Sequence, residues 1–200
     1  MLYTSIEKLK AQLGIPESDT TRDAQLTAAL RAVCEAIDNA TGRSFAPATG
    51  VATIRTVRAR VQHTDEGQVL LVDDIGSAIG LTAQAGRAGG SFSPVTGALE
   101  LYPLEDVERG WAATGVLLSG GTWPTGPGAR IQMGGDWGWP ATPAVVEQAS
   151  LLQGSRIFKR KDSPEGILGS AEWGALRVSR VDPDVEAMLA PLRREIALVG

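Results

Sequence analysis

The chain has 200 residues, 43% of them hydrophobic, and a formal net charge of -4. This length suits one ordinary domain or a small domain with a large insertion, and the acidic balance excludes an overall attraction to nucleic-acid phosphates as the main means of binding. Cys34 is the only cysteine, which excludes an internal disulfide framework and is typical of a reducing cytoplasm.

The N-terminal segment predicts two helices. Thr4 and Glu7 have the spacing of a capping box, and Gly14 ends the first helix. This segment lacks the continuous apolar core of a signal peptide, and no run in the chain reaches membrane-spanning length. A second, longer helix ends at Gly42, and Cys34 beside its apolar stripe is interpreted as a packing residue. The stripe consists of Leu26, Leu30, Val33, Ile37 and Ala40.

The middle of the chain, from about Phe45 to Met133, predicts strands separated by glycine. Because the connections are too short for crossover helices, the sheet is expected to be antiparallel. The first run predicts a half-exposed strand with its arginines on the solvent side. Two stretches rich in glycine and proline, AGRAGGSFSP and GGTWPTGPG, are expected to be loops. The predicted strands are TIRTVRARVQ, QVLLVDDI, AIGLTAQ, GALELYPL, TGVLLSG and ARIQMGG.

A third helix is predicted from about Ala144 to Arg160. Thr142 is its expected N-cap and Pro143 its first residue. Trp137 and Trp139 lie just upstream at strand spacing, and we interpret them as large aromatics that cover the start of this helix. The helix has a broad apolar arc, which indicates that it packs against two partners. The arc consists of Ala144, Val145, Ala149, Leu151, Leu152 and Phe158.

Basic residues crowd the end of this third helix, where the helix dipole favours positive charge. They indicate a solvated helix end, with contact to phosphates as the alternative. These residues are Arg156, Lys159, Arg160 and Lys161. A glycine-rich loop follows, and a last helix begins at the cap Asp182 with Pro183 in its first position and is kinked or ended by Pro191. Its apolar face consists of Val185, Met188, Leu189 and Leu192.

Helical ends around a strand-rich middle predict an α+β fold. The expected architecture is a small α-helical bundle, formed by the N- and C-terminal segments, with a large antiparallel β-rich insertion. The expected parts are residues 1–45, residues 46–136 and residues 137–200, of which the first and third pack as one helical domain.

Residues with catalytic or metal-binding chemistry are scarce. His63 is the only histidine and follows no metal-binding pattern; beside Asp65 and Glu66 it is interpreted as a surface residue. Asp73 and Asp74 are adjacent on a predicted strand, so they are expected to point to opposite faces. No nucleophile elbow, phosphate-binding loop or dinucleotide fingerprint is present. The sequence therefore disfavours an enzyme and predicts no metal or cofactor.

Taken together, the helical segments resemble the head-tail connector, or head-completion adaptor, family of long-tailed bacteriophages, prophages and gene-transfer particles. A short first helix of the YTSIEKLKAQLGI kind precedes a helix ending in IDNATGRSF, and a strand-rich insertion follows. WGWPATPAVVEQA then leads into a long helix closing on RIFKRKDSPEGILG, and the last segment is VSRVDPDVEAMLAPLRR. The likeness covers both helical ends, whereas residues from about 46 to 132 match in character only.

This resemblance implies a structural virion protein located at the head-tail junction and assembled in the host bacterial cytoplasm. Copies would form a ring of about twelve, through head-to-tail contacts between neighbours, beneath the portal after DNA packaging. The ring would extend the DNA channel without binding DNA specifically and carry the tail or stopper protein; no membrane is involved.

Family analogy also assigns surfaces. The C-terminal segment, Val181 to Gly200, is expected to dock on the portal, and loops of the β-rich insertion to contact the next ring or the capsid. Val145, Leu152 and Phe158 are candidates for contacts between copies or between helices. The candidate docking residues are Val185, Met188, Leu189, Leu192, Arg193 and Arg194.

Two other functions remain open at this point. One is another neck or tail-terminator ring component of the same kind of particle. The other is a small DNA-contacting packaging factor, in which the bases of RIFKRK would meet phosphates. Copurification with portal or tail tube, and salt-dependent binding to duplex DNA, separate these alternatives.

Overall fold

The structure is a computed structural model that describes residues 1–160, 167–168, 176–177 and 182–194. These residues form two compact units. The helical unit comprises Met1–Arg43 and the described part of Thr142–Ile196, and the sheet unit comprises Ser44–Ala141. The sequence placed the second boundary before residue 137. The sheet unit instead continues through Ala141, because the two tryptophans of this stretch pack with the sheet.

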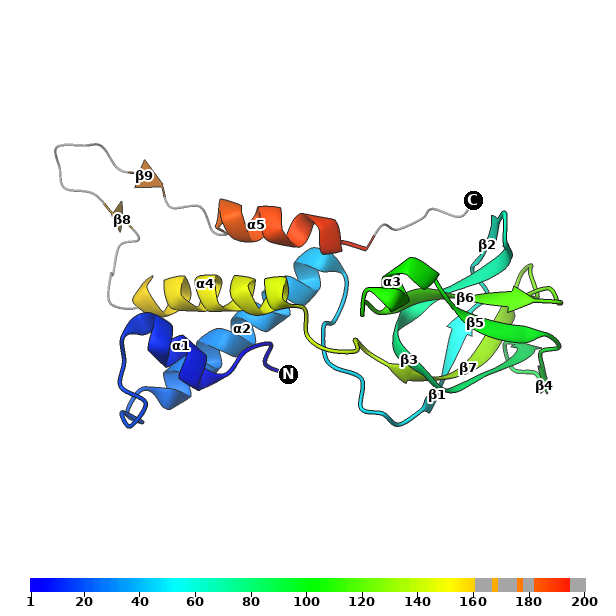
Figure 1. Cartoon of the computed structure of the whole chain (residues 1–200), viewed down its shortest axis with the longest axis horizontal. Coiled ribbons are helices and arrows are strands. Elements are labelled where there is room, and N and C mark those ends of the chain that lie inside the picture. The colour runs from blue at the N-terminus through cyan, green and yellow to red at the C-terminus, as the bar shows by residue number, and fades with distance from the viewer. Residues whose placement is uncertain (161–166, 169–175, 178–181, 195–200) are drawn as a thin grey trace. The chain divides into compact units, whose positions relative to one another are not determined.

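The helical unit is built around one long helix that contacts the other three α-helices (Figure 1). The elements of this part of the chain are α1 (Ile6–Leu13), α2 (Asp23–Thr41), α4 (Ala144–Arg160), α5 (Pro183–Leu189), the 3-10 turn η1 (Ala190–Leu192) and the two-stranded pair β8 (Ile167–Leu168) with β9 (Leu176–Arg177). Helix α4 is the one that packs with α1, α2 and α5. The predicted bounds of the third helix are confirmed.

The first helix is capped one residue later than expected. Ser5, not Thr4, is the N-cap, and its side chain accepts a hydrogen bond from the backbone N–H of Lys8 at 3.3 Å. Gly14 ends the helix with φ of 70°, as predicted. Thr4 is buried instead, and its hydroxyl lies 3.2 Å from a carboxylate oxygen of Glu147 on α4. The capping-box prediction was therefore wrong by one residue.

The apolar stripe of α2 is confirmed except at its last position. Ala40 is exposed, and Thr41 is buried in its place. With 3.6 residues per turn, either position 40 or position 41 could continue the buried line after Ile37. In this helix, position 41 is the one that faces inward. The Thr41 hydroxyl donates to the backbone oxygen of Ile37 at 2.8 Å, which satisfies this polar group inside the unit.

The sheet unit holds one antiparallel sheet of seven strands, so the predicted α+β class and sheet type are confirmed. Its main path runs in the order β1-β7-β3-β6-β5, while β2 and β4 each pair with β3 (Figure 1). The elements are β1 (Thr53–Arg58), β2 (Val61–Thr64), β3 (Gly67–Arg87), β4 (Phe92–Pro94), β5 (Ala98–Tyr102), α3 (Leu104–Glu108), β6 (Ala113–Ser119) and β7 (Ala129–Trp137).

Strand β3 joins two runs that the sequence predicted as separate strands. Its first part pairs with β6 and its second part with β7, with register shifts between them. Gly76 lies between the two predicted runs and Gly80 within the second, AIGLTAQ, and both glycines have a role in packing. A Cβ atom at Gly80 would lie 2.3 Å from the Cβ of Ala52, and one at Gly76 would lie 2.7 Å from that of Ala48. These glycines let the segment before β1 cross the strand closely.

Two further elements were missed. AGRAGGSFSP was expected to be a loop, yet Phe92–Pro94 forms β4, which pairs with the end of β3 around a turn at Gly89 and Gly90. Helix α3 lies in a stretch for which no helix was predicted. Both elements are too short to carry a recognisable hydrophobic period.

Trp137 and Trp139 belong to the core of the sheet unit. The indole N–H of Trp137 donates to the backbone oxygen of Thr53 at 2.8 Å, and that of Trp139 donates to a carboxylate oxygen of Asp74 at 3.1 Å. Trp139 is fully buried against Phe45, with ring centroids 5.1 Å apart. The sequence assigned these rings to the start of the third helix, and the structure places them within the sheet unit.

Candidate assembly interface

Helix α5 has the predicted start, and its apolar face is already occupied. The Asp182 side chain accepts from the backbone N–H of Asp184 at 2.9 Å, and Pro183 takes the first helical position. Three candidate docking residues are buried within the helical unit, where α5 packs on α4. They are Val185, Leu189 and Leu192. These side chains therefore hold α5 in place, and only Met188 of the predicted apolar face is half-buried.

The two arginines that follow η1 differ in their surroundings. Arg193 is exposed and forms an ion pair with Glu186 at 3.2 Å. The backbone N–H of Arg194 donates to the backbone oxygen of Thr41 at 2.8 Å, which fixes the chain to the end of α2. Among the candidate docking residues, Arg193 is thus exposed, and Met188 and Arg194 are half-buried.

The buried residues of helix α4 differ in part from the predicted apolar arc. Phe158 is buried in a cluster of the helical unit, whereas Val145 and Leu152 are only half-buried. Val146 and Ala149 are the buried residues of the first turns. The other buried members of the Phe158 cluster are Leu9, Leu26 and Leu30. Phe158 is consequently used for packing inside the unit, and Val145 and Leu152 retain exposed area for another contact.

The predicted basic cluster at the end of α4 is divided. Arg156 forms an ion pair with Asp182, which links the end of α4 to the cap of α5. Lys159 is exposed. The side chain of Arg160, and Lys161 as a whole, lie outside the described residues. The negative charge of Asp182 offsets the positive charge of Arg156, which weakens the attraction of this arginine for a phosphate.

A second polar contact fixes the N-terminal segment to α4. Glu147 accepts a hydrogen bond from Lys8 and forms an ion pair with it. This hydrogen bond from Lys8 is the main reason why the pKa of Glu147 lies below its usual value, and Thr4 adds a second donor. The carboxylate therefore stays charged at neutral pH and connects α1 to α4.

Cys34 has the surroundings of a packing residue. Its side chain is 3% exposed, and burial raises the pKa of the thiol. The backbone N–H of Tyr3 lies 3.4 Å from the sulfur. Burial also raises the pKa of nearby Asp38, whose carboxylate accepts from the Tyr3 hydroxyl. A buried thiol with a raised pKa is a poor nucleophile.

The remaining titratable candidates are dispersed. His63 is exposed on β2, beside the turn where the sequence expected it. Asp73 is exposed and Asp74 is buried, so they point to opposite faces as predicted. Within the described ranges, no group of three or more histidine, cysteine, aspartate or glutamate residues could hold a metal ion. Over the same ranges, no helix combines the length and apolar character that crossing a membrane requires.

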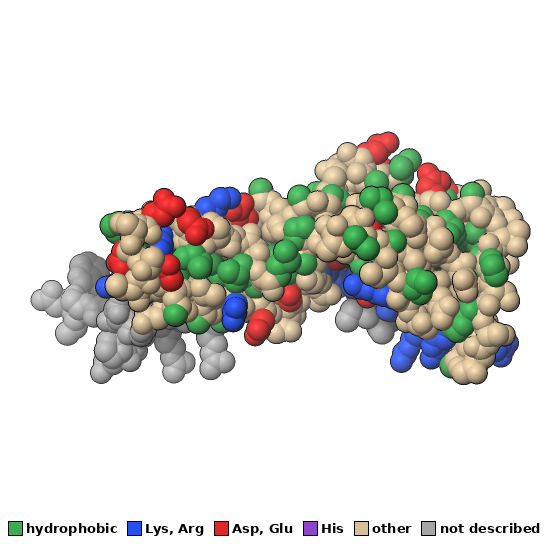
Figure 2. Space-filling model, turned by 90° about the horizontal axis from the view of Figure 1, so that it is seen from below, with side chains coloured by type: hydrophobic (Ala, Val, Ile, Leu, Met, Phe, Trp, Pro, Cys, Tyr) green, Lys and Arg blue, Asp and Glu red, His purple; other side chains and the backbone are tan. Residues whose placement is uncertain are grey.

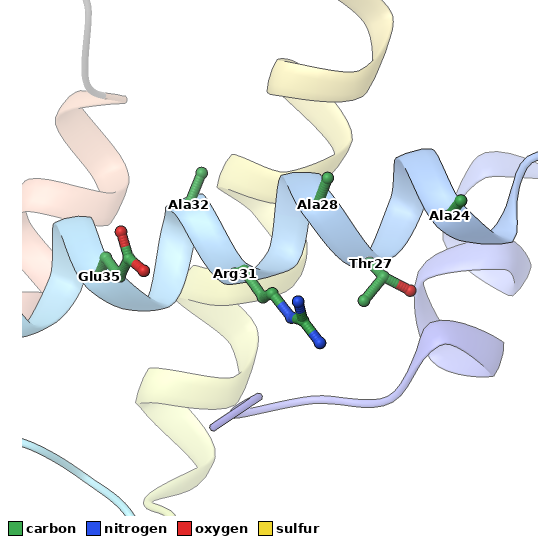
Figure 3. Close-up of a pocket in the computed structure, with 6 residues that line it drawn as sticks. All are labelled: Ala24, Thr27, Ala28, Arg31, Ala32 and Glu35. Carbon is green, nitrogen blue, oxygen red and sulfur yellow. The ribbon is translucent and has the colours of Figure 1, made fainter.

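A hollow lies along the outer face of α2 (Figure 3). Its lining combines small side chains with one arginine and one glutamate, and contains no nucleophile or metal ligand set. All six lining residues come from α2: Ala24, Thr27, Ala28, Arg31, Ala32 and Glu35. The lining therefore supplies no catalytic chemistry.

The large hydrophobic side chains that are exposed lie mainly in the sheet unit. Among the described residues, six large hydrophobic side chains are exposed; five of them belong to the sheet unit, and the sixth is that of Met1. They are Val51, Ile54, Ile79, Leu104 and Trp111. Sequence reasoning missed these residues, because a single apolar side chain in a short strand or loop gives no periodic signal. One feature of the sequence could have indicated this exposed surface. TIRTVRAR is rich in arginine, which is unusual for a strand inside a sheet.

Comparisons with known proteins identify a shared fold. No protein-family model matches the sequence, and no curated protein sequence matches it. The structure is similar to a chain in the neck of an empty gene transfer agent particle, computed with C6 symmetry, with a TM-score of 0.59 and 18% identity. It is also similar to a chain in the virion of a native gene transfer agent particle, with a TM-score of 0.55 and 21% identity. Each alignment covers 99% of this chain and 93% of the other chain.

Proposed function

We propose that this protein is a structural component of the neck of a phage-like particle, and that its copies form the adaptor ring between portal and tail. The observation that carries the proposal is the likeness of fold, over nearly the whole of both chains, to a chain in the neck of a gene transfer agent particle. A fold can host several functions, so the proposal also depends on the surfaces of this chain. Among the described residues, those surfaces carry exposed apolar and charged side chains that are suited to contacts with other proteins.

The proposed ring contains about twelve copies joined head to tail, so that one surface of each copy meets a different surface of the next. Such a ring extends the channel through which packaged DNA passes. The net charge of -4 suits this task, because a channel that must release DNA should not attract its phosphates strongly.

Portal docking is assigned to the C-terminal segment, in which some residues hold the helix in place and others contact the portal. Val185, Leu189 and Leu192 hold α5 on the helical unit, because all three are buried there. Met188, Arg193 and Arg194 have the side chains that remain accessible to the portal, and the backbone of Arg194 also fixes the direction of the chain. The charge of Arg193 is only partly offset by Glu186, because both side chains of this pair are largely exposed.

The test is a native mass measurement on the full chain mixed with the portal encoded by the same genome. A defined complex with one ring per portal is the expected result. Met188→Glu combined with Arg193→Glu should abolish the complex without unfolding the chain, since neither side chain is buried. The matched control is Ala28→Glu combined with Arg31→Glu at exposed positions of α2, which changes the net charge by the same amount and should bind the portal normally.

Three results would contradict the proposal in different ways. No complex with a properly folded portal would exclude the adaptor role and favour another neck or tail-terminator position. Unchanged binding by the Met188 and Arg193 variant would refute the docking assignment alone. Strong binding to duplex DNA that falls steeply with salt would favour the DNA-contacting alternative.

A further inference from the structure

The sheet unit has two edges of opposite charge. On the main path of the sheet, β1 is the first strand and β5 the last, and each pairs with one neighbour only among the described strands. In Figure 2 basic side chains gather along one margin of the sheet unit, and the acidic ones seen most clearly stand at the opposite margin. An unpaired sheet edge presents free backbone groups and is a ready site for association.

The basic edge lies on β1 and the strand ends beside it. Arg58 is directly opposite Arg130 in the pairing of β1 with β7, and Arg87 ends the neighbouring part of β3. None of these three arginines forms an ion pair within the part of the chain that the structure describes. Like charges directly opposite each other in a sheet are destabilising. An acidic partner bound at this edge would relieve the repulsion between the arginines.

The basic edge also carries apolar side chains. Ile54 on β1 is 70% exposed, and Val51 precedes it in the same segment. Ile79 is close to this segment, because its neighbour Gly80 touches Ala52. Exposed aliphatic groups rimmed by arginine are characteristic of a protein-protein contact, whereas duplex DNA offers them no apolar surface of comparable size.

The acidic edge is formed by β5 and α3. Glu100 is exposed on β5, and Glu105 and Glu108 are exposed on α3. Asp106 adds a half-buried carboxylate, and Arg109 is the one basic residue in this stretch. No ion pair in the described residues involves Glu100, Glu105 or Glu108. The edge is therefore net negative and has charge to offer to a basic partner.

This second edge has apolar anchors as well. Leu104 is 48% exposed at the start of α3, and Trp111 is 38% exposed just after it. The ring of Trp111 packs against that of the buried Trp139, with centroids 6.1 Å apart. This contact holds Trp111 in position before any partner arrives, which lowers the entropic cost of binding. Tryptophan and arginine are the residues that most often dominate the energy of protein interfaces.

From this complementarity we infer that the basic edge of one copy binds the acidic edge of the next copy. The defining residues are Ile54, Arg58 and Arg130 on one edge and Leu104, Glu105, Glu108 and Trp111 on the other. Because the two edges differ, the contact joins copies head to tail and can close into a ring. The inference rests on the proposed ring assembly and locates its interface in the sheet unit.

The experiment uses the full chain in two charge-reversed forms. Arg58→Glu with Arg130→Glu makes both edges acidic, and Glu105→Arg with Glu108→Arg makes the acidic edge basic. Each form alone should self-associate about a hundredfold more weakly than the unaltered chain, because like charges then face each other across the contact. An equimolar mixture should recover association, since every edge again finds its opposite. Analytical ultracentrifugation near the solubility limit measures both effects.

Controls separate the contact from folding. Arg22→Glu, at the N-cap of α2, with Arg31→Glu, on its exposed face, changes the net charge as much as the first form does and should associate like the unaltered chain. Leu104→Ser and Ile54→Ser alter exposed side chains only, and each should weaken association about tenfold while the circular dichroism spectrum stays unchanged.

The inference is overturned if a charge-reversed form associates normally, if the mixture fails to recover association, or if the unaltered chain stays monomeric at its solubility limit. It is also overturned if the Arg58 and Arg130 form loses salt-sensitive binding to duplex DNA and nothing else. Portal binding is measured separately. If the unaltered chain binds the portal but the edge variants do not behave as expected, this inference alone is rejected. If the unaltered chain does not bind the portal, the proposed function is rejected.

Discussion

The helical unit and the sheet unit use similar residue types in opposite ways. In the helical unit, apolar faces of all four α-helices pack on one another, and charged side chains such as Lys10 and Asp23 pair at 2.6 Å within the unit. In the sheet unit, arginines and large apolar side chains stand exposed at two edges. A unit that satisfies its own groups acts as a scaffold, and one that leaves them open is suited to binding copies or partners.

The largest expected effect comes from the core of the sheet unit. Trp139→Ala removes a fully buried ring that contacts Phe45 and Trp111, and should lower the free energy of unfolding by about 4 to 5 kcal/mol. Urea denaturation followed by near-ultraviolet circular dichroism measures it. Trp139→Phe keeps most of the volume and loses the hydrogen bond to Asp74, so its loss should be smaller. Equal losses in the two variants would contradict this account of the core.

The matching experiment in the helical unit is Phe158→Ala. Its ring packs with Leu9, Leu26 and Leu30, and removing it should cost about 3 to 4 kcal/mol. The midpoint of urea unfolding, followed by the helical signal, reports the change. Lys159→Ala next to it is exposed and should have little effect. A Phe158 variant as stable as the Lys159 control would mean that this face is open in the free protein, which would restore Phe158 as a candidate contact between copies.

A smaller effect is expected at the cap of α5. Asp182→Ala removes the N-cap hydrogen bond and the ion pair with Arg156, and should destabilise α5 by about 1 to 2 kcal/mol. Asp182→Asn retains an acceptor for the cap and should recover about half of that loss. Hydrogen exchange of the α5 amides distinguishes the two. Unchanged exchange in the alanine variant would show that the cap does not hold the segment.

The smallest expected effect depends on pH. The pKa of Glu147 is lowered in the folded chain, chiefly by the hydrogen bond from Lys8, from the usual 4.5 of a glutamate side chain. The stability from this pair is therefore complete above pH 4.5 and is lost as the pH falls through the lower, folded-state value. Glu147→Gln should flatten the acid side of the stability profile by less than about 1 kcal/mol, because the pair is partly exposed. Identical acid profiles in the two proteins would contradict the assigned role of this carboxylate.

Periodicity made the helical unit largely predictable. Leu26, Leu30 and Val33 recur with the helical repeat, and the cap and proline of α5 have a direct local signature. The choices between Thr4 and Ser5, and between Ala40 and Thr41, depend on which neighbour packs there, so local sequence left them open. The burial of Phe158 likewise depends on α1 and α2, which are distant in sequence.

The sheet unit was predictable in class and not in detail. The course of β3 depends on Gly76 and Gly80, whose meaning appears only when Ala48 and Ala52 cross them. The charged edges follow from strand order, which places Arg58 beside Arg130 although the two are far apart in the chain. Nothing in the separate runs predicts that pairing, because strand order is set by tertiary packing and not by local propensity.

The measurement that tests the central claim most directly is the position of this chain in particles produced from its own genome. Met1 is exposed, so a label added there should leave the fold unchanged. The account predicts that image averaging of purified particles places the label in a ring at the junction of head and tail. A label found on the capsid surface or at the tail tip, or particles that lack the chain while remaining complete, would contradict it.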